Sequence, residues 1–171
     1  MLTLALIFII LEITGLHKYY MMNPDFEVQK ASEQDLPSIY ELVKELAVYE
    51  KEPDAVSASL NDYQNDFRNN IFQSLVAKNK KSIAGMAIFY PAYSTWKGKM
   101  LFLEDIIVTK SYRNQGIGQL LFDAILKLAK EENYRLVKWQ VLDWNEPAIK
   151  FYEKYNVKFE SNWWNGKIFI D

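Results

Sequence analysis

The sequence contains no cysteine and a single histidine, His17. The absence of cysteine excludes disulfides, thiolate catalysis and cysteine metal sites, and a lone histidine argues against a histidine-based metal centre or catalytic triad. The formal net charge is only −2 and the pI is near 5.6, so the chain lacks the basic excess of nucleic-acid-binding proteins. We therefore expect neither a metal nor a nucleic-acid partner.

Long apolar runs are also scarce. Residues 1–11 are almost entirely apolar, but Glu12 ends the run before it reaches the length of a membrane span. The segment lacks the basic region and the small-residue cleavage site of a signal peptide. We interpret residues 1–22 as an upstream N-terminal extension, which a native start at Met21 or Met22 would remove, and residues 23–171 as the domain. An extra helix or a weakly membrane-associating segment are the alternatives. We expect a cytoplasmic protein without a membrane partner.

Apolar residues are plentiful, and their spacing predicts the fold. Hydrophobic residues make up 50% of the 171-residue chain and aromatic residues 15%, which suits one domain with a proper core. Apolar patterns predict strands at residues 26–31, 72–78, 83–93, 100–108 and 136–142, with a closing hairpin of residues 157–163 and 167–170. Helical spacing predicts helices at residues 32–49, 59–69, 117–128 and 145–155. The fold class is α+β, with a mixed, mostly antiparallel sheet of about six to seven strands flanked by about four helices.

The central stretch of the chain has the order strand, glycine-containing turn, helix. The turn carries Arg113-Asn-Gln-Gly-Ile-Gly118 directly before the helix. The first amides of a helix have no intrahelical partner, and glycine lets a ligand approach the backbone closely. With the arginine, this arrangement favours phosphate oxygens. Plain turn chemistry is the alternative, and the spacing matches neither a Rossmann fingerprint nor a Walker loop.

Two motifs resemble a known family. The pattern R-x-x-G-x-G after an apolar strand resembles the diphosphate loop of the GNAT N-acetyltransferases. The string L-E-D-I-I-V-T-K-S-Y-R-N-Q-G-I-G, together with W-N-E-P-A-I-K-F-Y at residues 144–152, resembles the branch of diamine (spermidine/spermine) and thialysine acetyltransferases. The resemblance covers residues 26–169. It implies a GNAT-like acyl-CoA N-acyltransferase fold, with acetyl-CoA as co-substrate and a primary amine of a small cationic molecule as acceptor.

The resemblance also implies where acetyl-CoA lies. Its pantetheine would lie beside the central strand like an added strand, along Ile106, Ile107 and Val108. The residues expected to hold the diphosphate are Arg113, Asn114, Gln115, Gly116, Ile117, Gly118 and Gln119. The residues expected at the far arm of the cofactor are Asn145, Glu146, Pro147 and Ala148.

Tyr152 is the candidate general acid. A phenol has a reference pKa of ~10, close enough to that of a thiol to pass a proton to a departing thiolate. The resemblance assigns this role to the tyrosine of the N-E-P-x-x-x-F-Y context, where it also touches the cofactor. The alternative is a core aromatic residue, since Phe151, Tyr152 and Tyr155 have helical spacing.

Glu104 and Asp105 are candidates on the amine side. A charged pair within an apolar strand is costly unless it is solvated or paired. Strand alternation sends neighbouring side chains to opposite faces, so we expect only one of the two to reach the cleft. The resemblance favours Glu104, in contact with the amine directly or through a water molecule. The alternative is that both are hydrogen-bonded structural carboxylates.

The resemblance further implies an acceptor pocket and a homodimer. Its expected substrate-binding residues are Tyr49, Glu50, Glu104, Asp105, Lys138, Trp139 and Gln140. Residues 161–167 lack the acidic pair and arginine frequent in the family, so a polyamine and a thialysine- or lysine-like acceptor both remain open. A protein or peptide N-acetyltransferase and a non-catalytic acyl-CoA-binding domain are the competing functions.

Overall fold

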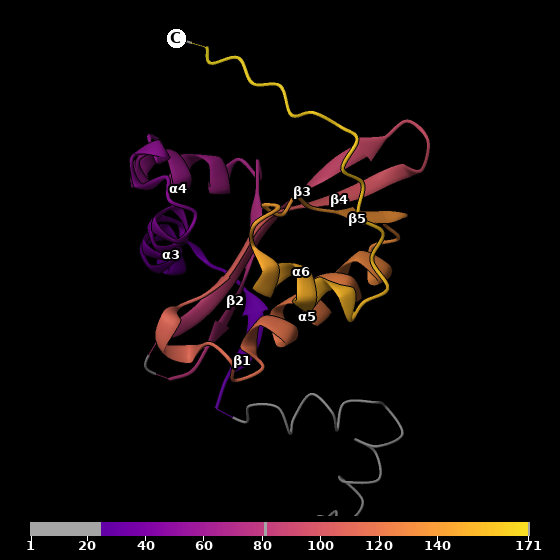
Figure 1. Ribbon diagram of the computed structural model, residues 1–171. Coiled ribbons are helices and arrows are strands. Elements are labelled where there is room, and N and C mark those ends of the chain that lie inside the picture. Colours follow the sequence, from indigo (N-terminus) through magenta and orange to yellow (C-terminus); the bar gives the residue numbers. More distant parts are fainter. Residues whose placement is uncertain (1–24, 81, 171) are drawn as a thin grey trace, which may run out of the picture. The chain divides into compact units, whose positions relative to one another are not determined.

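The structure is a computed structural model that describes residues 25–80 and 82–170 (Figure 1). The proposed extension at residues 1–22 lies outside the described residues. The chain divides after Trp139 into two units, the first ending there and the second running from Gln140 onward.

The first unit is built on a five-stranded sheet with the spatial order β1-β2-β3-β4-β5. β4 pairs antiparallel with β3 and parallel with β5, and the other neighbouring pairs are antiparallel. The mixed, mostly antiparallel sheet is therefore confirmed. The strands are β1 (Glu27–Lys30), β2 (Gln73–Lys78), β3 (Ile83–Ser94), β4 (Gly98–Val108) and β5 (Leu136–Lys138).

Helices cover both faces of this sheet (Figure 1). α3 (Leu36–Tyr49) and α4 (Leu60–Arg68) lie on one face, and α5 (Ile117–Glu131) lies on the other. Short 3₁₀ turns precede them at η1 (Glu33–Asp35), η2 (Pro53–Ala55) and η3 (Lys110–Tyr112). No helix in the described parts of the chain combines the length and apolar character needed to cross a membrane.

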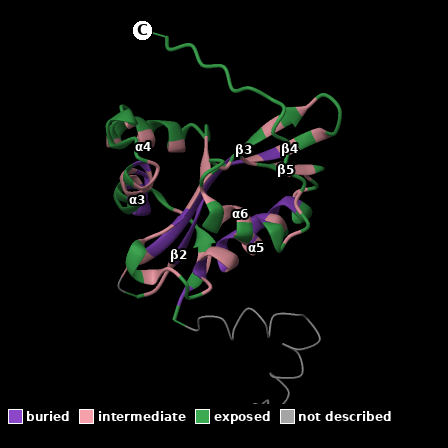
Figure 2. Ribbon diagram, viewed as in Figure 1, coloured by how far each residue is buried: buried purple, intermediate pink, exposed green. Residues whose placement is uncertain are grey.

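The core lies between the sheet and these helices, where buried residues concentrate on the inner strands and on α5 (Figure 2). On the α3 side, Met86, Ile88 and Ile107 of the sheet join a buried cluster with Leu36 and Ile39. On the α5 side, Gly85 of β3 leaves no room for a side chain, because a Cβ there would meet the Ile107 carbonyl oxygen of β4 at 2.6 Å and Leu121 Cδ1 of α5 at 3.2 Å. Glycine at position 85 thus permits this packing.

The second unit contains one helix, α6 (Glu146–Glu153), with Asn145 as its N-cap. The predicted closing hairpin is wrong, because residues 157–163 and 167–170 form no strand. Their large side chains are exposed: Trp164 is 97% and Ile170 is 90% accessible. An isolated two-stranded hairpin is marginal without a third strand or a helix to cover its apolar face. The described sheet accordingly has five strands rather than six to seven, and β5 ends at Lys138 rather than at residue 142.

Candidate active site

β4 contains a β-bulge at Glu104. Ile88 of β3 lies opposite Asp105, whereas the next residue, Phe89, lies opposite Leu103. Glu104 is therefore the extra residue in the β3–β4 ladder. A bulge bends the strand and interrupts the alternation of side chains between the two faces.

The bulge brings both acidic side chains to the α3/α4 side of the sheet. The Tyr90 hydroxyl donates a 2.9 Å hydrogen bond to Glu104 Oε2. Asp105 lies opposite Ile88, a residue of the core on the α3 side. Both carboxylates also act electrostatically on Tyr63 of α4. The expectation that alternation separates Glu104 from Asp105 is therefore wrong.

A third carboxylate adds to this pair. Glu50 is the C-cap residue of α3, and burial raises its pKa. Burial, followed by the charges of Glu104 and then Glu50, raises the pKa of Asp105 from its ordinary value of 3.8 to about 7. Carboxylates that lie close together where solvent has little access repel one another. A bound cation relieves this repulsion, so such a cluster favours cation binding.

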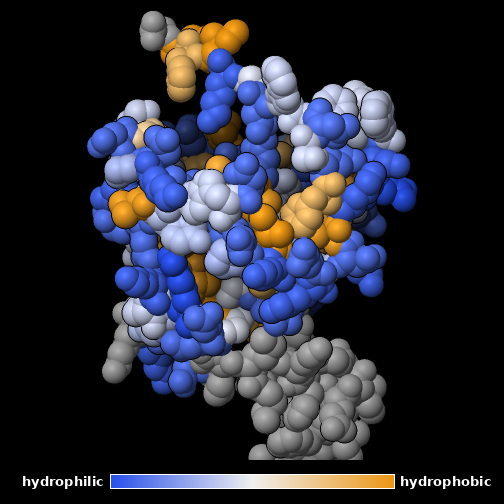
Figure 3. All heavy atoms as spheres, in the orientation of Figure 1, coloured by the Kyte–Doolittle hydropathy of each residue, from blue (hydrophilic) through white to orange (hydrophobic). Residues whose placement is uncertain are grey.

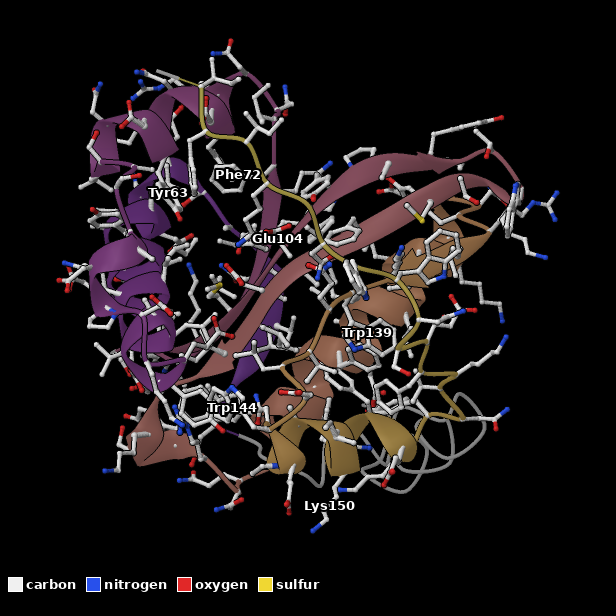
Figure 4. All side chains as sticks on the ribbon, turned by 45° about the horizontal axis from the view of Figure 1, so that its top comes forward. Tyr63, Phe72, Glu104, Trp139, Trp144 and Lys150 are labelled. Atoms are coloured by element: carbon white, nitrogen blue, oxygen red, sulfur yellow. The ribbon has the colours of Figure 1, made fainter. Side chains whose placement is uncertain are left out.

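Tyrosines line the same region, and sequence reasoning missed them. Burial, together with the nearby carboxylates, raises the pKa of Tyr63 and of Tyr90 to about 12, so both phenols remain neutral hydrogen-bonding groups. Tyr63 makes edge-to-face contacts with Tyr40 at 5.3 Å and with Phe72 at 5.6 Å between ring centroids. Figure 4 shows Tyr63 and Phe72 together with Glu104 on β4. Only the helical spacing of Tyr63 and Phe67 could have indicated an aromatic face on α4.

The segment between β4 and α5 has the backbone of a tight turn. Asn114 has φ 61° and Gly116 has φ 80°, and Gly116 is the N-cap of α5. The first regular helix bond runs from the Leu120 amide to the Gly116 carbonyl oxygen at 3.0 Å. The amides of the first turn therefore point out of the helix end with the positive end of its dipole. Such a site suits an anion.

Arg113 does not extend freely from this turn. Its Nε donates to the Val108 carbonyl oxygen at 2.9 Å, and its Nη2 lies 3.5 Å from Glu45 Oε1. The guanidinium carbon also lies 5.0 Å from the ring centroid of Tyr49. Tyr49, a predicted acceptor residue, thus contacts the turn through Arg113.

One edge of β4 is only partly paired. Within residues 25–80 and 82–139, β5 pairs with Met100, Leu101 and Phe102 alone. The adjoining stretch of β4, residues 103–108, pairs with β3 on its other side. Its backbone groups on the β5 side can therefore accept an extended ligand as an added strand. The predicted pantetheine residues Ile106, Ile107 and Val108 belong to this stretch.

The remaining predicted residues lie on β5 and in the second unit. Lys138 is exposed, whereas Trp139 packs its ring edge-to-face on Phe122 at 5.3 Å. In the second unit, the side-chain amide of Gln140 donates a hydrogen bond from Nε2 to Asn165 Oδ1. Figure 4 labels two other residues of this unit, Trp144 and Lys150.

Tyr152 is a buried residue of α6, 5% exposed, with its ring 5.2 Å from that of Phe151. Asn145 Oδ1 accepts from the Ala148 amide at 3.3 Å, so its side chain caps α6. The roles of Tyr152 and of residues 140 and 145–148 stay predictions.

Comparisons with known proteins agree with this geometry. The sequence profile of the acetyltransferase (GNAT) family matches residues 36–156. A thialysine N-epsilon-acetyltransferase of Caenorhabditis elegans is 30% identical over 129 residues, 75% of this chain and 81% of that protein. The Bos taurus protein of the same name is 33% identical over 136 residues, 74% of this chain and 80% of that protein. The human spermidine/spermine N(1)-acetyltransferase-like protein 1 is 32% identical over 74% of this chain, but only 20% of that protein is covered.

Solved structures share the fold. An aminoglycoside acetyltransferase from an uncultured soil metagenomic sample superposes with a TM-score of 0.74 at 18% identity, covering 88% of this chain and 99% of that chain. The bulged central strand, the glycine turn and the sequence relatives are mutually consistent. The chain therefore belongs to the acetyltransferase (GNAT) family, in the branch that includes thialysine and diamine N-acetyltransferases, and it is an enzyme of the transferase class.

Proposed function

We propose that this enzyme transfers an acetyl group from acetyl-CoA directly to a primary amine of a small cationic acceptor, either a polyamine or a thialysine- or lysine-like molecule. The observation that carries the proposal is the cluster of Glu50, Glu104 and Asp105 at the bulge of β4, beside the partly paired edge of the same strand. A site for the ammonium group and a site for the pantetheine would thus adjoin on β4.

The donor half uses backbone groups. Residues 106–108 would hold the pantetheine as an added strand, and the amides of residues 114–119 would hold the diphosphate at the helix end. Asn145, Glu146, Pro147 and Ala148 would contact the far arm of the cofactor. The backbone geometry supports this fit, because Gly116 already adopts the left-handed conformation that opens the helix end.

The acceptor half uses electrostatics. The carboxylates of Glu50, Glu104 and Asp105 would bind the ammonium group, and the rings of Tyr49 and Tyr63 would line its path. Lys138 and Gln140 would contribute the outer wall, whereas Trp139 packs on Phe122 of α5, the helix that covers the opposite face of the sheet. An acceptor with positive charge gains from this arrangement, whereas an anionic acceptor would be repelled.

Proton movement follows from the same residues. Acetyl-CoA supplies an acetyl group activated as a thioester. Glu104 would take the ammonium proton, directly or through a water molecule, so that the amine nitrogen can attack the carbonyl carbon. Asp105, whose pKa of about 7 makes it a stronger base than an ordinary aspartate, would share that proton. Tyr152 would donate its phenolic proton to the sulfur as the carbon–sulfur bond breaks, and the second proton lost by the nitrogen as the amide forms would restore the phenol through solvent.

A thiol-release assay tests this function. Purified protein is mixed with acetyl-CoA and, separately, spermidine, thialysine, lysine and a histone-like peptide. We expect release with the small cationic amines and acetylation of their primary amine by mass spectrometry. The roles of the two residues are tested with Glu104→Gln and Tyr152→Phe. These variants keep the size of each side chain and remove its carboxylate or hydroxyl group. Each should reduce turnover by roughly 10²-fold or more.

Other outcomes would replace the proposal. Release with the peptide alone would indicate a protein N-acetyltransferase. Binding of CoA without release for any acceptor would indicate a non-catalytic acyl-CoA-binding domain. Wild-type turnover in Tyr152→Phe would exclude the phenol as the acid, and unaltered activity of Glu104→Gln across pH would exclude the proton relay through that residue.

We also propose that the enzyme is a homodimer. The second unit exposes large apolar side chains near the C-terminal end, where Figure 3 shows hydrophobic atoms, and burial in a partner would stabilise them. The residues concerned are Trp163, Trp164, Ile168, Phe169 and Ile170. Light scattering coupled to size exclusion should give twice the mass of the chain. A monomer at micromolar concentration would contradict this.

A further inference from the structure

A single side chain from α3 holds the segment between β4 and α5. Glu45 accepts hydrogen bonds through both carboxylate oxygens. Its Oε2 accepts from the Thr109 hydroxyl at 2.6 Å, and its Oε1 accepts from the Lys110 amide at 2.8 Å. The same Oε1 lies 3.5 Å from Arg113 Nη2. Three donors of one short segment thus converge on one carboxylate, 64 to 68 residues away along the chain.

The third contact partner of Glu45, Arg113, is directed toward α3. Its Nε is used by the Val108 carbonyl oxygen and its face by the ring of Tyr49. The Glu45 and Arg113 side chains are 32% and 34% exposed, so solvent screens their attraction only in part. The hydrogen bonds to the charged carboxylate are of the stronger class. Together these contacts fix the segment from both of its ends.

The conformation held in this way leaves the first amides of α5 directed out of the helix end, where an anion can bind. Asn114 and Gly116 both have positive φ, and a non-glycine residue adopts that region only at a cost. A segment that is already ordered before binding loses little conformational entropy when the ligand binds. Its affinity for the ligand is therefore higher. An untethered segment would have to be ordered by the ligand itself.

We propose that Glu45 is a positioning residue for the donor site. It holds residues 109–116 so that the amides at the start of α5 meet the diphosphate, and Arg113 is its structural partner rather than a direct phosphate ligand. This inference rests on the proposed function, because it takes the diphosphate of acetyl-CoA as the ligand. Glu45 itself touches neither substrate.

The sign of the mutational effect separates positioning from simple electrostatics. Glu45 places a negative charge near the proposed anion site, so its removal should by charge alone strengthen CoA binding. Positioning predicts the opposite. Glu45→Ala should weaken CoA binding about tenfold, the change that accompanies loss of a charge-assisted hydrogen bond. Glu45→Gln keeps one oxygen acceptor and should fall between Glu45→Ala and the wild type.

The experiment combines calorimetric titration with CoA and steady-state kinetics. In Glu45→Ala, the Kd for CoA and the KM for acetyl-CoA should rise together, while kcat at saturating acetyl-CoA and the KM for the amine change less than about twofold. Glu41→Gln is the matched control, one turn earlier on α3 and paired with Lys44 at the surface, and it should behave as the wild type. Thermal melting confirms that each variant is folded, and Glu45→Gln carries the test if Glu45→Ala is not.

A double-mutant cycle tests the role of Arg113. If Arg113 acts through Glu45, adding Arg113→Gln to Glu45→Gln causes little further loss of CoA affinity. An additive loss would show that Arg113 supports CoA binding independently of Glu45 and would overturn that part of the inference. Wild-type or tighter CoA binding by folded Glu45 variants would overturn it entirely. Absence of CoA binding by the wild-type protein would overturn the proposed function as well.

Discussion

The Tyr90 hydroxyl lies 2.9 Å from the carboxylate of Glu104, and this contact exists because Glu104 is the additional residue of the bulge in β4. Tyr90 also stacks on Phe102, with 5.3 Å between ring centroids, which fixes the phenol in place. A tyrosine on one strand thus orients the carboxylate that the proposed reaction uses on the next.

Removal of this hydroxyl should weaken catalysis without unfolding the protein. Tyr90→Phe keeps the stacked ring and removes the donor to Glu104. We expect kcat/KM for the amine to fall by up to about tenfold, the usual effect of losing one hydrogen bond to a charged group. Steady-state kinetics with varied amine measures it. Tyr93→Phe, at an exposed position on the same strand, is the control. Equal kinetics in Tyr90→Phe and wild type would mean that Glu104 needs no such support.

Asp105 should make stability depend on pH. Because its pKa is raised from 3.8 to about 7, the folded chain binds this proton more tightly than the unfolded chain. Stability therefore falls as pH rises from about 4 to about 7 and stays low above that range. Asp105→Asn should raise the free energy of unfolding at pH 8 by on the order of 2 kcal/mol, with a smaller gain near pH 4.

Urea denaturation of the wild type and of Asp105→Asn at several pH values measures the free energy of unfolding as a function of pH. The exposed Asp54→Asn serves as control and should show the wild-type pH profile. Acetyl transfer should be lower in Asp105→Asn although the protein is more stable, because the neutral amide attracts a cation less. A variant that is less stable than the wild type at pH 8 would contradict the assigned charge repulsion.

Asp35 should have the opposite pH dependence. Burial raises its pKa, but hydrogen bonds from the Ser32 amide and hydroxyl and from Lys78 outweigh this, and the net pKa is lowered. Its contribution is therefore present at neutral pH and is lost as pH falls below about 4, through the folded-state pKa. Asp35→Asn should destabilise the fold by about 2–3 kcal/mol at pH 7, since Lys78 loses its 3.1 Å partner.

A second capping box supplies the matched control for Asp35. Asp62 accepts from the Ser59 amide and hydroxyl in the same arrangement, but at the surface. Asp62→Asn should therefore cost clearly less stability than Asp35→Asn in chemical denaturation. Equal losses would show that the cap, and not the partly buried ion pair with Lys78, provides the stabilisation.

The two glycines of the turn should respond differently to alanine. Gly116 has φ 80°, so Gly116→Ala should destabilise the fold by about 1–2 kcal/mol. Gly118 lies within α5, and a Cβ there would meet Val108 Cγ2 at an ordinary 3.7 Å. Gly118→Ala should thus raise stability by about 0.5 kcal/mol through helix propensity. Thermal unfolding of both variants measures this, and a stabilising Gly116→Ala would contradict the left-handed cap.

The helices and the first four strands could be predicted from the sequence because local patterns specify them. Ser32 with Asp35 and Ser59 with Asp62 mark helix starts, and the apolar spacing from Ile117 onward marks α5. The closing hairpin could not be judged in this way. Asn165-Gly166 has the chemistry of a turn, but pairing also requires neighbours that cover the apolar face.

The site was predicted only in part, for a physical reason. Glu104, Asp105 and the glycine turn are contiguous in sequence, so their motif is visible. The bulge depends on the register between β3 and β4, which no local pattern determines. Glu45, Tyr63 and Tyr90 reach the site from distant parts of the chain, and their contacts arise only on folding.

A chain without residue 104 would place Leu103 and Asp105 next to each other, opposite Phe89 and Ile88, and would restore an uninterrupted ladder between the two strands. The sheet itself has no need of the additional residue. Deleting Glu104 should leave the free energy of unfolding at least as high while abolishing acetyl transfer. A single-residue deletion would thus separate the stability of the fold from the activity of the enzyme.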